Sequence, residues 1–247
     1  MAGRTYKTEA IVLRSLRFAE ADRILHLYTL DRGRIGAIAK GVRKTKSRFG
    51  ARLEPLSHVA LVLHEGSGEL HTVTGVELIG SHHATRENNY RLGVGSMGAE
   101  AMLRLFGEPE ANGRAFAALV RFLDLLDETP ATGNGGPGID PLGLSFQLKL
   151  LWLSGYLPHV TACVECGSTG ELVGFSARAG GAVCAAHARG AFELSAEGLA
   201  GIERLLSVPL ADAVGAGLTD HARREALAVV TSSYEEHGGF RLRTLSA

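Results

Sequence analysis

The sequence lacks the short motifs by which several classes of enzyme are recognised. It contains no GxxxxGK[ST] phosphate loop, no HExxH zinc-protease pair and no GxSxG nucleophile elbow. None of its ten histidines begins the HxE pair of a zinc deaminase. Its aspartates and glutamates are scattered, without the paired arrangement that acid–base chemistry uses. We therefore expect that the protein is not an enzyme.

Long hydrophobic segments are also missing. The longest apolar run, Leu142–Leu153, is interrupted by Lys149 and is shorter than the roughly 20 residues that cross a bilayer. The first ten residues lack the apolar stretch of a secretory signal peptide. At 247 residues, 45% hydrophobic and 21% charged, the chain can bury one large core or two to three small ones, and it is not disordered as a whole. These features predict a cytoplasmic protein without membrane contact.

The net charge is zero, but the charges are unevenly distributed. Residues 1–52 hold 13 Lys and Arg against 4 acidic residues, a local charge of +9. Residues 53–247 hold 13 basic and 22 acidic residues, a charge of −9. Such asymmetry indicates a polyanionic partner for the first part and a different role for the second.

The first third of the chain has the residue alternation of β-strands. Strands are expected at Thr5–Leu13, Ile24–Leu30, Ile35–Lys40, Leu56–Leu63 and Leu70–Ile79. The segment Val42–Pro55 has room for a short helix between the third and fourth strands. Five strands with a helix after the third are the order of an OB-fold, a Greek-key barrel often used to bind oligonucleotides. We predict an OB-fold nucleic-acid-binding domain at residues 1–80.

After residue 80 the pattern becomes helical. Helices are expected at Tyr90–Phe106, Phe116–Leu126, Leu142–Tyr156, Ser195–Leu206 and Thr219–His237. The third of these is apolar almost all round, which predicts the buried centre of this part. The predicted fold class is therefore α+β and multidomain: an N-terminal OB-fold β-barrel, then an α-helical domain at residues 81–247 with an embedded zinc-binding module.

The three cysteines all lie in one short segment. Cys163 and Cys166 form a first pair of ligands, and Cys184 and His187 form a second pair, with 17 residues between the pairs. This spacing is typical of a structural zinc knuckle or ribbon, with four ligands and no vacant position. It predicts one structural Zn²⁺ per chain in a module at residues 159–190, with a small hairpin between the pairs. The alternatives are unrelated thiols, or a disulfide, which a reducing cytosol disfavours.

The densest group of cations follows the third expected strand. It comprises Lys40, Arg43, Lys44, Lys46, Arg48 and Arg52, and Arg34 on the strand itself extends it. Cations neutralise phosphates and release counterions, which predicts that these seven residues bind nucleic acid. A solvated loop that binds nothing is the alternative. Phe49 stands among the cations, and it could stack on an unpaired base or belong to the barrel core.

These stretches resemble the N-terminal signature of the RecO family of bacterial recombination mediators. The resemblance rests on five segments: Glu9–Arg14, Glu20–Leu25, Gly33–Ile35, Ala39–Lys44 and Ser47–Pro55. It is dense over about the first 60 residues, and the CxxC region of the second half is consistent with it. Many relatives carry a fourth cysteine where this chain has His187, and imidazole is an equally competent zinc ligand.

The resemblance implies a role in DNA repair and DNA recombination after DNA damage. It implies binding to single- and double-stranded DNA, single-stranded DNA annealing, and help in loading the recombinase RecA onto strands coated by single-stranded DNA-binding protein. The implied partners are RecR, that coating protein and RecF, and the implied location is the nucleoid. The same residues leave alternatives open: an RNA-binding OB-fold factor, a scaffold whose basic loop meets an acidic protein, and, more remotely, a zinc hydrolase.

Overall fold

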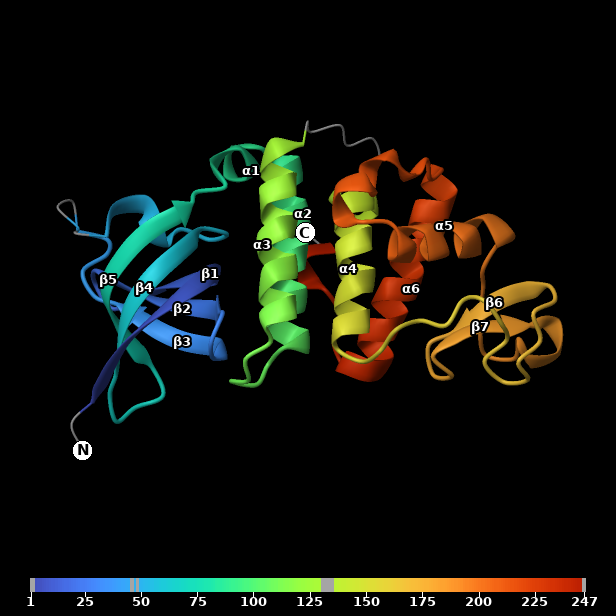
Figure 1. Ribbon diagram of the computed structural model, residues 1–247, viewed down its shortest axis with the longest axis horizontal. Coiled ribbons are helices and arrows are strands. Elements are labelled where there is room, and N and C mark those ends of the chain that lie inside the picture. Colours follow the sequence, from blue (N-terminus) through green and yellow to red (C-terminus); the bar gives the residue numbers. More distant parts are fainter. Residues whose placement is uncertain (1–2, 45–46, 48, 130–135, 246–247) are drawn as a thin grey trace. The chain divides into compact units, whose positions relative to one another are not determined.

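The first five strands close into a barrel (Figure 1). The computed structural model describes residues 3–44, 47, 49–129 and 136–245. The strands are β1 (Arg4–Phe18), β2 (Asp22–Thr29), β3 (Gly33–Ala39), β4 (His58–Glu65) and β5 (His71–Gly80). They are hydrogen-bonded in the order β1-β2-β3-β5-β4, and only the β3–β5 pair among them is parallel. The predicted five-stranded barrel is confirmed, and a 3₁₀ turn (Gly50–Leu53) occupies the place of the expected helix.

The interior of the barrel is aliphatic because alternate residues of each strand point inward. On β3, Ile35, Ala37 and Ala39 are buried, whereas the residues between them are partly exposed. The inward side chains of the other strands complete this core, together with Phe49 and Leu53 from the loop between β3 and β4. The loop between β3 and β4 is therefore anchored to the barrel at its far end.

Three helices follow the barrel and belong to the same compact unit, residues 1–129. They are α1 (His83–Glu87), α2 (Asn89–Leu105) and α3 (Gly113–Glu128). The side chain of Asn88 caps α2 and that of Asn112 caps α3, each by accepting a hydrogen bond from a backbone N–H of the first turn. Edge-on ring contacts join barrel to helices, Tyr28 with Phe106 and His58 with Phe116. The domain boundary expected at residue 80 stays a prediction.

The second compact unit, residues 130–247, contains the other long helices. They are α4 (Pro141–Leu153), α5 (Ala196–Ser207) and α6 (Asp220–Gly238). Most of α4 is buried, as its uniform hydrophobicity predicted, and α5 and α6 both pack against it. The helix ends three residues earlier than expected, since Gly155 adopts a left-handed conformation (φ +86°).

A small three-stranded sheet lies between α4 and α5 in sequence (Figure 1). It consists of β6 (Leu172–Ser176), β7 (Gly181–Cys184) and the two-residue β8 (Phe192–Glu193), in the order β7-β6-β8. The hairpin of β6 and β7 was predicted, but the third strand was not, because two residues carry no readable alternation. Within the described residues, none of the helices is both long and apolar enough to span a membrane.

Candidate metal centre and nucleic-acid interface

Two tight local structures position the four predicted metal ligands. The chain turns back directly after Cys166, because Gly167 takes a left-handed conformation (φ +72°) and its N–H donates to the carbonyl of Cys163. Cys184 is the last residue of β7, and a 3₁₀ turn (Ala185–His187) carries the imidazole back toward it. Each pair of ligands is thus close because of its own short turn. The N–H of Val164 donates to the carbonyl of Ala182 on β7 (3.0 Å), which holds the first pair beside the strand that ends at Cys184.

The ligand atoms lie close enough together to surround one metal ion. All four are within 4.8 Å of one another. The Sγ atoms of Cys166 and Cys184 are 3.9 Å apart, and Nδ1 of His187 is 3.7 Å from Sγ of Cys163 and 3.3 Å from Sγ of Cys184. A tetrahedral zinc site with ordinary bond lengths has S–S edges of roughly 3.8 Å and S–N edges of roughly 3.6 Å. The residues therefore fit a zinc ion, and the three cysteines are free thiols.

The local electrostatics favour the thiolate at Cys163 and Cys184 but not at Cys166. Hydrogen bonds from backbone N–H groups, that of Cys184 first, lower the pKa of the Cys163 thiol to about 6. The imidazole of His187 lowers the pKa of the Cys184 thiol, and the pKa of His187 is raised in return. The N–H of Ser168 lowers the pKa of the Cys166 thiol, but the hydrogen bond with the Cys163 thiol and burial outweigh this, so that the pKa is raised. Thiolates are the form that binds zinc. A Cys₃His site offers no open position, so it can hold the fold together but cannot activate a water molecule.

The cations predicted to bind DNA lie on the barrel where the structure describes them. Lys40, Arg43, Lys44 and Arg52 are exposed, and Arg34 is partly exposed on the outer side of β3. Lys46 and Arg48 lie outside the described residues. These five described residues lie on β3, in the first part of the loop after it and, for Arg52, in the 3₁₀ turn at the far end of this loop; they are called the basic region.

The start of this loop is fastened to the turn between β1 and β2. The N–H of Arg43 donates to the carbonyl of Ala21 (2.9 Å), and its guanidinium donates to the carbonyl of Glu20 (3.1 Å). The N–H of Gly41 donates to the carboxylate of Asp22 (2.7 Å). Arg43 therefore has a structural contact in addition to its exposed charge, and the loop cations are held beside the end of the β1–β2 hairpin.

Two basic residues that sequence reasoning missed lie on the outer side of the same strands. Arg14 on β1 stands directly opposite His26 on β2, and Arg14 and Arg34 are each close enough to His26 to interact with it electrostatically. Burial, followed by the charges of Arg14 and Arg34, lowers the pKa of His26 below 6.5. A β-bulge between Val12 and Arg14 turns Arg14 outward, and a bulge cannot be read from one sequence.

Phe49, for which the sequence left two roles open, lies in the barrel core. Its side chain is 1% exposed among the inward aliphatic residues of the strands. A ring in this position cannot stack on a base in solution. The core interpretation is therefore confirmed and the stacking interpretation is wrong.

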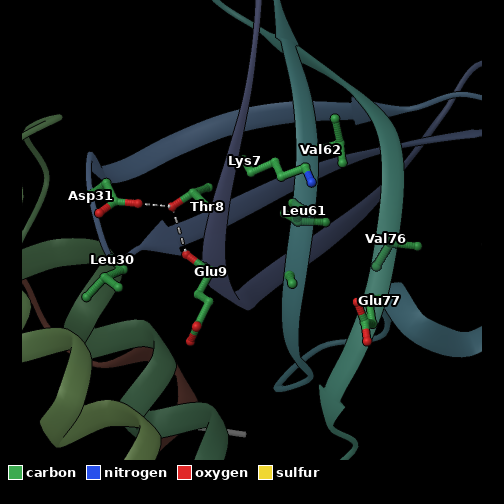
Figure 2. A pocket seen from close by; sticks show the side chains of 10 residues that line it. Lys7, Thr8, Glu9, Leu30, Asp31, Leu61, Val62, Val76 and Glu77 are labelled. Atoms are coloured by element: carbon green, nitrogen blue, oxygen red, sulfur yellow. Dashed lines mark hydrogen bonds between the residues drawn. The ribbon is translucent and has the colours of Figure 1, made fainter.

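A different side of the barrel is hollowed and acidic. The hollow has a volume of about 520 Å³. It is lined by residues of β1, β4, β5 and the β2–β3 turn, whose side chains are drawn in Figure 2. Among the described residues that line it, Glu9, Asp31 and Glu77 carry carboxylates and Lys7 carries a positive charge. The hydroxyl of Thr8 donates to the carboxylate of Asp31 (2.9 Å) (Figure 2). Three carboxylates against one ammonium repel phosphate, so this hollow does not belong to the basic region.

Family models match almost the whole chain. The model described as "Recombination protein O N terminal" matches residues 1–82, and "Recombination protein O C terminal" matches residues 86–246. The first of these ranges contains the barrel, and the second contains all the long helices and the Cys₃His cluster.

Curated relatives of similar length lead to the same family. The chain is 39% identical to the DNA repair protein RecO of Rubrobacter xylanophilus, over 89% of this chain and 88% of the relative. It is 38% identical to that of Frankia casuarinae, over 97% and 96%, and 34% identical to that of Anaeromyxobacter sp., over 96% and 92%. The resemblance found in the sequence is confirmed. The chain belongs to the RecO family of DNA repair proteins, which are recombination mediators and not enzymes.

Proposed function

We propose that the protein binds single- and double-stranded DNA through the basic region of its barrel and anneals complementary strands in recombinational repair. The observation that carries this proposal is the cluster of exposed cations on β3 and the loop after it, Lys40, Arg43 and Lys44 above all. Membership of the RecO family supports DNA as the polyanion in preference to RNA. We include Lys46 and Arg48 in the interface on their sequence position alone.

The proposed mechanism of annealing needs no bond chemistry. Two complementary strands repel each other because each carries one charge per phosphate, and a basic surface lowers that repulsion while both strands are bound. Contacts to phosphates carry no information about base sequence, so binding is largely sequence-independent. In this scheme the protein also helps to load RecA onto strands coated by single-stranded DNA-binding protein.

The second half of the chain serves other proteins in this proposal. Its excess of acidic residues makes it a poor surface for DNA. We assign to it, on the family resemblance, the contacts with RecR, with single-stranded DNA-binding protein and with RecF, at the nucleoid in the cytoplasm. One structural Zn²⁺ bound by Cys163, Cys166, Cys184 and His187 would hold the small sheet of this half together. The domains are proposed at residues 1–80 and 81–247.

The test is strand annealing by the full-length chain and by a variant with Arg43→Ala, Lys44→Ala and Lys46→Ala. If about six cations contact single-stranded phosphates, log K falls with log salt at a slope of about −4, and loss of three cations reduces it to about −2. We expect slower annealing and this flatter slope in the variant. An unchanged slope would show that DNA lies elsewhere.

A matched control removes three other exposed cations. Arg114 and Arg121 on α3 and Arg224 on α6 are exposed and lie outside the barrel. Their joint replacement by alanine changes the net charge equally and should leave annealing and the slope unchanged. Competition between DNA and RNA oligonucleotides of the same sequence distinguishes a DNA-binding protein from an RNA-binding factor. If DNA gives no gel shift at moderate salt, the protein would instead be a scaffold that binds an acidic protein.

A further inference from the structure

The outer side of β1, β2 and β3 exposes apolar side chains between the cations. Leu16 on β1 is 36% exposed, and it stands opposite Ile24 on β2, which stands opposite Ile38 on β3. Phe18 follows on the same side of β1, 46% exposed. At the other edge, Leu70 before β5 is 39% exposed. These five residues, called the apolar strip, lie side by side on β1, β2 and β3 and reach the beginning of β5.

The edge of the strip at Leu70 depends on a glycine. Gly36 on β3 lies under the Leu70 side chain so closely that a Cβ atom at this position would be 2.7 Å from Cδ2 of Leu70. Thr72 of β5 stands beside Ile38 in the parallel pairing, which places residues 70 and 72 on the outer side together with Ile38. Gly36 thus lets Leu70 fold over the sheet and extend the strip.

Cations lie on both sides of the apolar strip. Arg14 and His26 form the neighbouring cross-strand pair on one side. On the other side, the turn after Phe18 accepts the hydrogen bonds from Arg43 that hold the basic loop in place. On the side of Phe18 the cations are accompanied by its cross-strand partner Asp22, whose carboxylate accepts from the N–H of Gly41. Ala19 in this turn has a left-handed conformation (φ +47°), so the chain reverses immediately after Phe18 and leaves its ring at the end of the hairpin.

This arrangement fits one kind of polyanion. Base faces are apolar and aromatic, and phosphates are charged, so a nucleic-acid strand can place its bases on the strip and its phosphates beside the flanking cations. A duplex hides its base faces by stacking and offers only phosphates to such a surface. The strip therefore gains contact area with a single strand and none with a double strand.

We propose that single-stranded DNA crosses the outer side of β1, β2 and β3 with an unstacked base on the ring of Phe18. Leu16, Ile24, Ile38 and Leu70 continue the surface on which neighbouring bases lie. This assignment rests on the proposed function, since it takes DNA as the ligand of the barrel. It makes Phe18 the residue that sets the preference for single strands over duplexes, whereas the cations serve both.

The experiment compares Phe18→Ala with the unmodified full-length chain on a single-stranded oligonucleotide and on a hairpin duplex of equal charge. Stacking on one aromatic ring changes affinity roughly tenfold to hundredfold. We expect a loss of this size for the single strand, less than about threefold loss for the duplex, and an unchanged salt slope. Phe18→Trp should retain single-strand affinity, because indole also stacks.

Ile79→Ala is the matched control. Ile79 is 49% exposed at the far end of β5, and the β3–β5 pairing involves only residues 71 and 72 of that strand. Its replacement removes a similarly exposed apolar side chain of the same barrel and should change neither affinity. A 2-aminopurine base in the single strand adds a second readout, since its fluorescence should be quenched on binding by the unmodified chain and by Phe18→Trp, and less by Phe18→Ala.

Different results would contradict the stacking role of Phe18 and the DNA-binding function of the barrel. Binding of both DNAs by the unmodified chain, with single-strand affinity and quenching unaltered in Phe18→Ala, would overturn the stacking assignment alone. An equal loss on both DNAs by a Phe18→Ala variant with unchanged circular dichroism would also overturn it, because a stacking residue discriminates between them. No binding of either DNA by the unmodified chain would remove the proposed function itself.

Discussion

The Cys₃His cluster and the outer side of the barrel are built in opposite ways. The cluster takes its four ligands from two segments of four residues, and each segment brings its two ligands together through its own tight turn. On the barrel surface, Arg14 and Phe18 come from β1 and His26 comes from β2, whereas the other cations come from β3 and the loop after it. The first depends on spacing along the chain, and the second depends on strand register.

This difference sets how each region responds to change. A tetrahedral site loses its ion when one ligand is removed, because the remaining three cannot complete the coordination shell. A surface of cations loses only a fraction of its affinity with each charge, since each phosphate contact contributes separately. We therefore expect all-or-none effects in the second half of the chain and graded effects in the first.

The largest effect is expected from the replacement Cys163→Ser. Elemental analysis should find one zinc per chain in the unmodified protein and almost none in the variant, because Cys163 is the buried ligand of the cluster. The small sheet should then lose protection from hydrogen exchange, whereas β1–β5 should keep theirs. DNA affinity of the barrel should persist, which would separate the two regions directly.

His159→Ala is the control for that experiment. His159 is exposed and lies close to the cluster in sequence, and its backbone pairs with that of residues 180 and 182. Its imidazole is not among the four grouped ligands, so the variant should retain one zinc. Unmodified protein free of metal when purified without chelator or tag would contradict the zinc assignment.

The next prediction concerns stability and compares two phenylalanines of the barrel, Phe49 and Phe18. Phe49→Ala should lower the free energy of unfolding by about 3–5 kcal/mol, because it removes a buried ring and leaves a cavity. Phe18→Ala should change that free energy by much less, about 0.5 kcal/mol, since this residue is 46% exposed on the outer side of β1. Urea denaturation of both variants measures the difference, and equal losses would contradict the assignment of one ring to the core and the other to the surface.

The same contrast between spacing along the chain and strand register explains which parts of these regions the sequence predicted. Cys163, Cys166, Cys184 and His187 were all identified, because a short turn converts spacing into geometry. The group of cations from Lys40 onward is visible in the sequence because its members are contiguous, and DNA binding by them stays a prediction. Phe18 was not singled out, because its neighbours on the surface come from other strands. The stacking role considered for Phe49 was wrong because position among cations along the chain says nothing about which way a side chain points.

The helices and strands show the same division: features set by neighbouring residues were predicted, and features set by contacts between distant residues were not. The five barrel strands and the five long helices were predicted from alternation and helical periodicity, with boundaries that shifted by a few residues. Helix α1 was missed because five residues carry too little periodicity. The bulge that turns Arg14 outward was missed because it is defined only against a partner strand.

The smallest effect concerns the pH dependence of DNA binding through His26. Burial and the charges of Arg14 and Arg34 lower the pKa of His26 below 6.5 in the free protein. Since the unfolded chain takes up this proton more readily, folding stability from this residue is present above pH 6.5 and is lost as pH falls below it. A phosphate backbone beside His26 acts in the opposite direction and raises its pKa, so binding and protonation favour each other.

We therefore expect affinity for DNA to rise as pH falls from about 7.5 to about 5.5, by a factor of up to roughly ten if the pKa rises by one unit on binding. The measurement is fluorescence anisotropy at constant ionic strength for the unmodified chain and for His26→Asn. His71, whose pKa is also lowered by burial, remains in both proteins, so the difference between them isolates His26. Identical pH profiles would mean that the phosphates do not approach the Arg14–His26 pair, and the DNA path would then have to leave β2 and follow the loop cations alone.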